Sequence, residues 1–356
     1  MQVLYVLYII ENNLLSRKEE LYVATTIKDI AQITGLGLAT ISSYLNGGNV
    51  REKNRIKIEN AIEDLNFEVN ETARGLKTNK TKTIGVVIPE LNNVFCTEII
   101  TEMEDILRKH GYATIICDCR TDKDLEKEAI EFLYRKRVDG IINMPVNVDD
   151  SHLKSFIKSK KPIVLIDRKI NGLDCDCVLV DNLNAVKEAI GILINNGHSK
   201  IGMISGPEEI FTAQERLLGY RLALIDAGIV PEERLIVHGD YTIQGGMKCI
   251  DELFKKNHDM TAVFISNYEM TMGTVIQLNE LGIKIPENIS VIGFDNIEFA
   301  RACKPKLTIV TQPTKEIAVN VAEIMLNRLN GDSEEKRIIK LRTGLLNGNS
   351  IDEPQP

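Results

Sequence analysis

The sequence of 356 residues lacks the features that mark several other classes of protein. It has no apolar run of the ~18 residues that a membrane-spanning helix requires. Its seven cysteines lack the spacing of a disulfide framework, which favours a reduced, cytoplasmic compartment. It has no phosphate-cradling Gly-x-x-x-x-Gly-Lys-Ser/Thr, no Gly-x-Ser-x-Gly and no His-Glu-x-x-His. We therefore expect neither a membrane protein nor an enzyme.

Two Cys-x-Cys pairs, Cys117-Asp-Cys119 and Cys175-Asp-Cys177, are the only candidates for a thiol switch or a metal pair. No further Cys or His stands at the spacing of a zinc site. We interpret them as ordinary cysteines and expect no metal and no cofactor.

Charge is distributed unevenly along the chain. The net charge is −8, yet residues 25–82 hold 9 Lys+Arg against 7 Asp+Glu, which is +2 and leaves −10 for the rest. This asymmetry favours DNA binding by the small N-terminal segment alone.

Residues 1–24 are expected to be an extension, either disordered or upstream of the true start. The apolar run Met1–Ile10 lacks a basic leader and a small-residue cleavage site, so it does not resemble a signal peptide. Lys18-Glu19-Glu20 can be encoded as a ribosome-binding sequence and Val23 as the start codon GTG. We expect translation to begin at Val23.

The segment 25–46 has the spacing of a helix-turn-helix. Apolar residues recur at helical intervals from Ile27 to Thr34, Gly35 interrupts the pattern, and a second apolar stripe follows at Leu38, Ile41 and Leu45. In this motif the second helix lies in the DNA major groove. The residues expected to reach DNA are Leu38, Ala39, Thr40, Ser42, Ser43 and Asn46. A third helix, with its apolar face at residues 58–65, completes a head.

From residue 82 onward, short apolar runs alternate with amphipathic stretches of helical length. This order is typical of parallel sheets with helices on both faces, and its length favours two lobes. The expected strands are 84–88, 112–117, 139–144, 162–167, 178–180, 200–205, 261–265 and 289–294.

Polar residues stand at the carboxyl ends of four of these strands, where open parallel sheets bind ligands. They are Asp118, Arg168, Asn267 and Asp295, and Phe95 follows the first strand. Carboxylate, amide and guanidinium groups suit the vicinal hydroxyls of a sugar. The alternative is that Asp295 and Arg168 cap helices or form an ion pair across the lobes.

Several further motifs occur in a fixed order along the chain. They are Glu71-Thr-Ala-Arg-Gly-Leu-Lys77, Val164-Leu-Ile-Asp-Arg168, Gly197-His198, Gln214-Glu-Arg-Leu-Leu-Gly-Tyr220, Pro286-Glu-Asn-Ile-Ser-Val-Ile-Gly-Phe-Asp295 and Leu307-Thr-Ile-Val-Thr-Gln-Pro313. With the helix-turn-helix, they make residues 25–346 resemble the LacI/GalR family of bacterial repressors.

The resemblance implies an α/β fold of two Rossmann-like lobes, similar to type I periplasmic-binding proteins, preceded by a small all-α helix-turn-helix domain. The implied boundaries are 25–70 for the DNA-binding domain, 71–82 for a hinge helix and 83–356 for the effector-binding and dimerisation domain. The N-lobe would hold about 83–180 and 314–345, and the C-lobe about 181–313.

The resemblance also implies site residues. In the hinge, Leu76 would be a minor-groove wedge, with Asn70, Arg74 and Lys77 contributing to DNA binding. The effector set implied by resemblance is Phe95, Arg168, Arg216, Asn267 and Asp295, with a stacking surface from Tyr268.

The sequence departs from the family pattern in both domains. Gly37 and Ser43 replace the usual serine and arginine of the recognition helix, and Phe67-Glu-Val-Asn70 replaces Tyr-Arg-Pro-Asn. In the effector domain, Asn267-Tyr268, Asp295-Asn296, Asn93-Val-Phe-Cys96 and Thr311 replace Asn-Asp, Asp-Asp, Asn-Pro-Phe-Phe and arginine. We expect an operator and an effector that differ from those typical of the family.

The leading hypothesis is therefore a ligand-responsive transcriptional repressor. A homodimer would bind palindromic double-stranded operator DNA, and a small molecule, a sugar or sugar derivative, would control this binding allosterically. The alternative is a solute-binding protein of a transport system, which shares the two-lobed fold. An enzyme is the third hypothesis, because fold alone does not exclude one.

Overall fold

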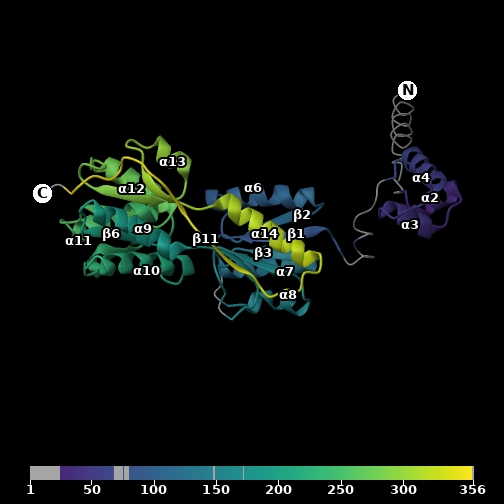
Figure 1. Cartoon of the computed structure of the whole chain (residues 1–356), viewed down its shortest axis with the longest axis horizontal. Helices are drawn as coiled ribbons and strands as arrows, with labels where there is room; N and C mark the ends of the chain where they lie inside the picture. Colours follow the sequence, from purple (N-terminus) through teal and green to yellow (C-terminus); the bar gives the residue numbers. More distant parts are fainter. Residues whose placement is uncertain (1–24, 68–74, 76–79, 147–148, 171, 355–356) are drawn as a thin grey trace, which may run out of the picture. The chain divides into compact units, whose positions relative to one another are not determined.

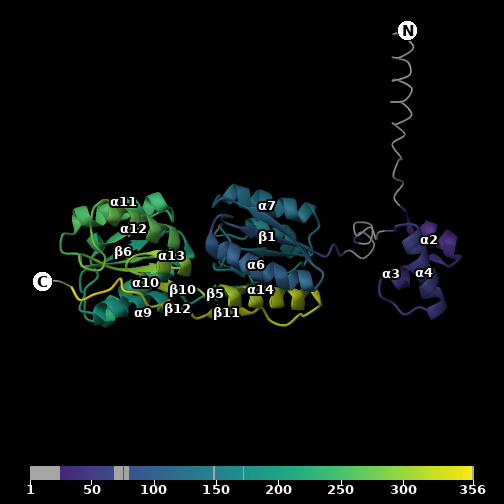
Figure 2. The same cartoon turned by 90° about the horizontal axis from the view of Figure 1, so that it is seen from above.

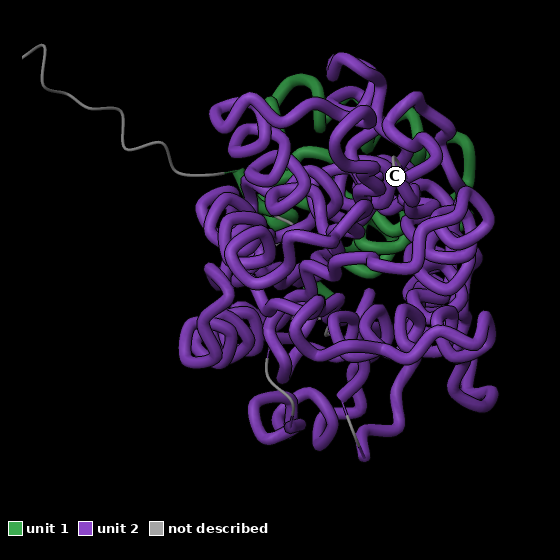
Figure 3. The backbone as a smooth tube through the Cα atoms, turned by 90° about the vertical axis from the view of Figure 1, so that its left-hand side faces the viewer, with its two compact units in different colours: residues 1–81 green, residues 82–356 purple. Residues whose placement is uncertain are grey.

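The computed structural model describes residues 25–67, 75, 80–146, 149–170 and 172–354. The chain divides into two compact units, residues 1–81 and 82–356 (Figure 3). Each unit has its own hydrophobic core. Among the described residues, no helix combines the length and apolarity needed to cross a bilayer.

Among its described residues, the first unit contains three short helices, α2 (Ile27–Thr34), α3 (Leu38–Leu45) and α4 (Glu52–Asp64). Gly35 ends α2 in the left-handed conformation (φ 64°), and its N–H donates to the carbonyl of Ala31 at 3.0 Å. Glycine suits this position because it has no Cβ to strain. One isoleucine from each helix, Ile30, Ile41 and Ile58, is fully buried and forms the centre of the small core.

Leu38 does not belong to the buried stripe that its spacing predicts. Its side chain is 48% exposed, whereas Ile41 is fully buried and Tyr44 packs against the core. Leu38 is the first residue of α3, where the chain has only just left the turn at Gly37. It is therefore available to a partner outside the head.

The second unit contains two sheets of six strands each. The first has the order β11-β5-β4-β3-β1-β2 and is parallel throughout. Its strands are β1 (Thr83–Ile88), β2 (Ala113–Asp118), β3 (Gly140–Asn143), β4 (Ile163–Ile166), β5 (Asp176–Val180) and β11 (Ile338–Leu341).

The second sheet has the order β12-β10-β9-β8-β6-β7, and only β12 runs antiparallel to its neighbour. Its strands are β6 (Ile201–Ser205), β7 (Ile236–His238), β8 (Ala262–Ile265), β9 (Ser290–Phe294), β10 (Thr308–Thr311) and β12 (Gly344–Leu346).

Helices cover both faces of each sheet, which makes two three-layered lobes (Figures 1 and 2). In the N-lobe, α6 (Val94–Lys109) and α14 (Thr314–Leu329) cover one face, and α7 (Lys123–Arg135) with the short η1 (Ser151–Leu153) and α8 (Lys154–Lys158) cover the other. The helices of the C-lobe are α9 (Asn182–Asn195), α10 (Phe211–Asp226), α11 (Ile243–Lys256), α12 (Tyr268–Glu280), α13 (Ile297–Ala302) and the turn η2 (Glu233–Leu235). Separate apolar cores fill the layers, because parallel strands bury both faces.

The chain crosses between the lobes once more than expected. The sequence places residues 314–345 in the N-lobe, but β12, residues 344–346, pairs with β10 in the C-lobe. The C-terminal segment then stays on that lobe, where the hydroxyl of Ser350 donates to the carbonyl of Val291 at 2.6 Å. The strands β7, β10, β11 and β12 were not predicted from the sequence.

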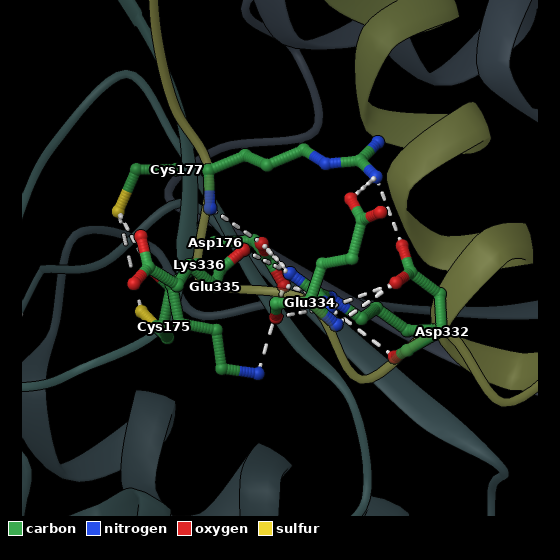
Figure 4. A network of polar contacts seen from close by, with 9 residues as sticks. Cys175, Asp176, Cys177, Asp332, Glu334, Glu335 and Lys336 are labelled. Carbon is green, nitrogen blue, oxygen red and sulfur yellow. Dashed lines mark hydrogen bonds and ion pairs between the residues drawn. The ribbon is translucent and has the colours of Figure 1, made fainter.

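A buried ion pair fixes the start of β11 (Figure 4). Arg328 of α14 binds both carboxylate oxygens of Asp176, at 2.9 Å from Nε and 2.8 Å from Nη2, and both side chains are at most 5% exposed. Asp176 also accepts from the backbone N–H of Arg337, while Arg328 donates to the carbonyls of Glu334 and Glu335. One guanidinium thus holds the loop that leads from α14 into β11.

Candidate functional site

A cavity of about 470 Å³ lies between the two lobes of the second unit. Its walls come from the loops and helix N-termini that follow the carboxyl ends of the parallel strands. In open α/β sheets this edge is where ligands bind, because strand ends and helix N-termini converge there. The cavity is therefore the candidate ligand site.

Arg216 of α10 forms part of the C-lobe wall and is only 5% exposed. Its Nε donates to Asn182 Oδ1 at 2.7 Å and its Nη1 to the carbonyl of Ser266 at 2.5 Å. The guanidinium carbon lies 3.9 Å from the centre of the Phe294 ring. These contacts fix the orientation of the guanidinium group in the wall of the cavity.

Asp295 follows β9 and has a left-handed backbone (φ 58°). Its N–H donates to the carbonyl of Val310 at 2.7 Å, which fixes the corner against β10. Gln312 Nε2 donates to its carboxylate at 2.8 Å. Burial raises the pKa of Asp295 to about 7; Arg216 and Gln312 oppose this rise, whereas Asp167 and Glu269 add to it.

Glu269, at the start of α12, connects the two walls. It accepts from Asn93 Nδ2 of the N-lobe at 2.8 Å and from Asn267 Nδ2 of its own lobe at 2.6 Å. The side chain of Asn267 also caps α12 by accepting from the N–H of Met270 at 3.1 Å. Burial, and then the charge of Glu90, raise the pKa of Glu269 above its ordinary value.

The N-lobe wall contains Asp167 and Arg168 after β4, together with Phe95 of α6. Asp167 has a left-handed backbone (φ 67°), and its N–H donates to the carbonyl of Val178 at 3.0 Å. Arg168 Nε lies 3.4 Å from Asp167 Oδ2, and its Nη1 donates to the carbonyl of Pro145 at 3.2 Å. Phe95 packs against the N-lobe core and presents an apolar surface to the cavity.

Among the described residues, four buried polar atoms of the cavity lining have no hydrogen-bond partner. They are Asp167 Oδ1, Gln312 Oε1, Arg168 Nε and the hydroxyl oxygen of Tyr241. Buried polar atoms normally find partners, because leaving one unpaired costs roughly 1 to 3 kcal/mol. Two of the four only accept, Arg168 Nε only donates and the hydroxyl can do either, so acceptors are in excess and the cavity suits a ligand that brings hydrogen-bond donors.

Six of the seven residues predicted for this site line the cavity, namely Phe95, Arg168, Arg216, Asn267, Tyr268 and Asp295. Their role in binding remains a prediction. Asp118 is exposed, lies outside the lining and accepts from the N–H of Arg120 at 2.9 Å, so its role in binding stays a prediction. The chain reaches the cavity a few residues later, at Thr121 and Lys123.

Sequence reasoning missed several lining residues. Asp167 and Gln312 stand inside motifs that were recognised, next to Arg168 and at the end of β10. Glu269 lies two positions after a predicted residue, but its contact with Asn93 joins positions 176 apart. Tyr241 follows β7, a strand of only three residues that gave no signal.

In the first unit, α3 presents the residues predicted to meet DNA. Leu38, Ala39 and Asn46 are exposed, and Thr40, Ser42 and Ser43 are partly exposed. The amide of Asn46 donates to the carbonyl of Ser42 at 2.6 Å, so it caps the end of α3. The other predicted DNA-contacting residues, Asn70, Arg74, Leu76 and Lys77, lie outside the described residues.

The cysteine pairs form no metal centre in the described part of the chain, where no cluster of three metal-binding side chains occurs. Cys175 Sγ and Cys177 Sγ lie 4.0 Å apart, and both residues are buried. Cys119 is buried and Cys117 is partly exposed.

Comparison with known proteins matches both units. Residues 26–70 match the model of bacterial regulatory proteins of the lacI family, and residues 81–347 match that of periplasmic binding proteins and the sugar-binding domain of the LacI family. Catabolite control protein A of Priestia megaterium is 32% identical over 318 residues, which cover 89% of this chain and 96% of that protein.

Two solved structures are similar over most of the chain. The transcriptional regulator CelR in complex with cellobiose has a TM-score of 0.71 and 27% identity, covering 92% of this chain and 99% of that one. The lac repressor dimer bound to operator and the anti-inducer ONPF has a TM-score of 0.81 at 22% identity, covering 92% and 98%, and shows the likeness of fold.

These matches confirm the fold class expected from the sequence, a small helical head followed by two α/β lobes. The chain therefore belongs to the LacI family of bacterial regulatory proteins, DNA-binding transcriptional regulators that carry an effector-binding domain.

Proposed function

We propose that this protein is a transcriptional repressor whose affinity for its operator is set by a sugar-like effector bound in the cavity between the lobes. The observation that carries the proposal is this cavity, lined from both lobes by strand-end polar groups with unpartnered acceptors, in a chain that also carries a helix-turn-helix head. The cellobiose complex of the similar regulator CelR supports a carbohydrate as the effector class.

In this proposal, Arg168, Arg216, Asn267 and Asp295 bind ligand hydroxyls, and Phe95 and Tyr268 contact the apolar face of a ring. Because the ligand would touch both lobes, its binding would favour one degree of lobe closure. A ligand shifts such an equilibrium only through its different affinities for the two states.

On DNA, two copies of the chain would place α3 in successive major grooves of a palindromic site. Bases would be contacted by the predicted residues of α3, Leu38, Ala39, Thr40, Ser42 and Ser43, and by Asn46 directly after it. The segment 71–82 would enter the minor groove with Leu76 as its wedge. Because bacterial DNA lies in the cytoplasm, the proposal also places the protein there.

The test is a fluorescence-anisotropy titration of the protein on DNA from the intergenic region upstream of its own gene, with and without a panel of sugars. We expect salt-sensitive, sequence-specific binding that one sugar weakens or strengthens. A Leu76→Ala variant should lose specific binding far more than nonspecific binding. The proposal would be contradicted if the protein showed no sequence-specific DNA binding, either without sugar or with any sugar of the panel.

A further inference from the structure

We propose that the effector is a small polyhydroxylated molecule that carries a protonated amine, and that the cavity rejects phosphorylated and carboxylated sugars. This inference rests on the proposed function, because it assigns a chemical class to the same site. It follows from the balance of charge in the cavity and from the partners that each charged group already has.

Carboxylates outnumber cations in the lining of the cavity. Among the partly or fully buried lining residues, four are acidic and two are basic: Glu90, Asp167, Glu269 and Asp295 against Arg168 and Arg216. Acidic residues are also in excess among the exposed lining residues, where four acids stand against one cation, Lys123. A ligand thus meets negative charge at the edge of the cavity and again inside it.

The two buried cations are already engaged by the protein. Arg216 donates to Asn182 and to the carbonyl of Ser266, and its ring contact is with Phe294. Arg168 pairs with Asp167 at 3.4 Å. The pairing offsets the charge of Arg168, whereas Arg216 keeps its charge and lowers the pKa of Asp295. The two cations therefore offset at most two of the four carboxylates.

The other three buried carboxylates are hydrogen-bonded by neutral side chains. Glu269 accepts from Asn93 and Asn267, and Asp295 accepts from Gln312. Glu90 accepts from the hydroxyl of Thr121 at 3.3 Å. Neutral donors orient a carboxylate without neutralising it. Arg216 offsets the charge of Asp295, so Glu90 and Glu269 are the carboxylates that present uncompensated negative charge when ionised.

The carboxylates raise one another's proton affinity, as like charges in a closed space do. Asp167 and Glu269 both raise the pKa of Asp295, which burial holds at about 7, and Glu90 raises the pKa of Glu269. An ammonium group would relieve this repulsion, whereas a phosphate would add to it. The unpartnered acceptors Asp167 Oδ1 and Gln312 Oε1 also favour a donor-rich ligand.

Glu269 is the carboxylate best placed to receive the ammonium. It is hydrogen-bonded from both lobes, by Asn93 of α6 on one side and Asn267 of the C-lobe on the other. An ammonium bound there would add a charge-assisted contact at the junction of the lobes. The hydroxyls of the ligand would then occupy the space between Asp295 and Arg168.

The experiment is calorimetric titration of the full chain with several hexoses. Each hexose is tested in three forms: the 6-amino-6-deoxy sugar, the parent sugar and the 6-phosphate. The alkylamine stays protonated from pH 6 to 8, as in lysine. We expect at least one amino sugar to bind about tenfold or more tightly than its parent, and the phosphates to bind most weakly. The affinity of the amino sugar should rise from pH 6 to 8. Its binding should release a proton, because the bound ammonium group lowers the pKa of Asp295.

A Glu269→Gln variant should reduce the preference for the amino sugar over its parent about tenfold, because glutamine cannot form an ion pair with the ammonium group. Glu208→Gln serves as the control, since this exposed carboxylate lies near the cavity but outside its lining. Equal or tighter binding of the parent sugar or the phosphate would overturn the proposal.

The same protein is titrated on operator DNA, which separates this inference from the proposed function. In one outcome, the protein binds its operator normally, no amino sugar changes that binding and calorimetry detects no bound amino sugar. This result would overturn the proposed ligand class but not the proposed function. Loss of specific operator binding would count against the proposed function instead.

Discussion

The two lobes repeat one architecture but use it differently. Both sheets have the same order of strands from the outer edge inward, β2-β1-β3-β4-β5 and β7-β6-β8-β9-β10. In both lobes the fourth strand ends in an aspartate with a left-handed backbone, Asp167 (φ 67°) and Asp295 (φ 58°). In both lobes, the N–H of this aspartate donates to a backbone carbonyl of the fifth strand, that of Val178 in one lobe and that of Val310 in the other.

The residue that follows makes the difference between these two corners. Arg168 follows Asp167 and lies 3.4 Å from its carboxylate, whereas Asn296 follows Asp295 and uses its side chain to cap α13. One carboxylate is therefore paired within its own lobe, and the other has only the amide of Gln312. The repeated backbone places an acid at the same point in each lobe, and the side chain that follows decides whether a cation pairs with it.

The sixth strands differ as well. In the N-lobe, β11 is held through the buried pair of Arg328 and Asp176 (Figure 4). In the C-lobe, the segment after β12 is held by neutral groups: the hydroxyl of Ser350 accepts from the N–H of Thr308 at 2.8 Å and donates to Val291. The lobes should therefore respond differently to the loss of one anchoring side chain.

The largest expected effect is that of Arg328→Met. The change leaves the carboxylate of Asp176 buried without its cation, which typically costs about 3 to 5 kcal/mol. Ser350→Ala in the other lobe should cost only about 1 to 2 kcal/mol, because it removes neutral hydrogen bonds. Urea unfolding followed by circular dichroism measures both free energies.

Arg108→Met is the control for the loss of an arginine. Arg108 forms ion pairs with Glu104 and Asp105, but its side chain is 63% exposed. Exposed pairs contribute about 0 to 1 kcal/mol. Equal losses for Arg328→Met and Arg108→Met would show that the buried pair does not anchor β11.

The next effect concerns the two aspartate corners. Asp295 has a pKa of about 7 in the fold, above its ordinary 3.8, so the folded state loses stability as pH rises from about 4 through 7. Asp295→Asn should therefore stabilise the ligand-free protein by roughly 2 kcal/mol at pH 8 and have little effect at pH 4. Thermal melts at both pH values give the difference.

Asp167→Asn provides the matched comparison. Asparagine tolerates a left-handed backbone as aspartate does, so neither substitution strains its corner. Because Asp167 is paired with Arg168, its substitution should give no gain in stability at pH 8. A similar gain from both variants would mean that the two corners do not differ in charge compensation.

How far the sequence predicts this molecule depends on the range of the interactions involved. Strand ends and helical periodicity are local, so Arg168, Asn267 and Asp295 were placed at the cavity before the fold was known. Asp118 lies outside the lining, whereas Thr121 and Lys123 after it line the cavity, because the path of the loop after β2 decides which residue reaches the cavity and spacing along the chain does not encode that path. The bridge from Asn93 to Glu269 has the same origin, since it exists only once the lobes face each other.

The smallest expected effect is a difference in how the two lobes respond to acid. In the C-lobe, the buried ring of His198 donates from Nε2 to the carbonyl of Asp352 and accepts from the hydroxyl of Thr261, each at 2.8 Å. Burial favours the neutral imidazole and lowers the pKa of His198 below its ordinary 6.5. Its contribution is present above pH 6.5 and is lost as pH falls through the lower, folded pKa.

In the N-lobe, burial acts to raise the pKa of Asp176, but Arg328 and the N–H of Arg337 outweigh it and hold that pKa below its ordinary 3.8. The stability that this pair contributes is therefore lost only in stronger acid. We expect wild-type stability to fall between pH 7 and 5 through His198, and His198→Gln to flatten this fall. Thermal melts across that range decide the point: an unchanged slope in His198→Gln would show that the histidine does not couple the C-terminal segment to pH.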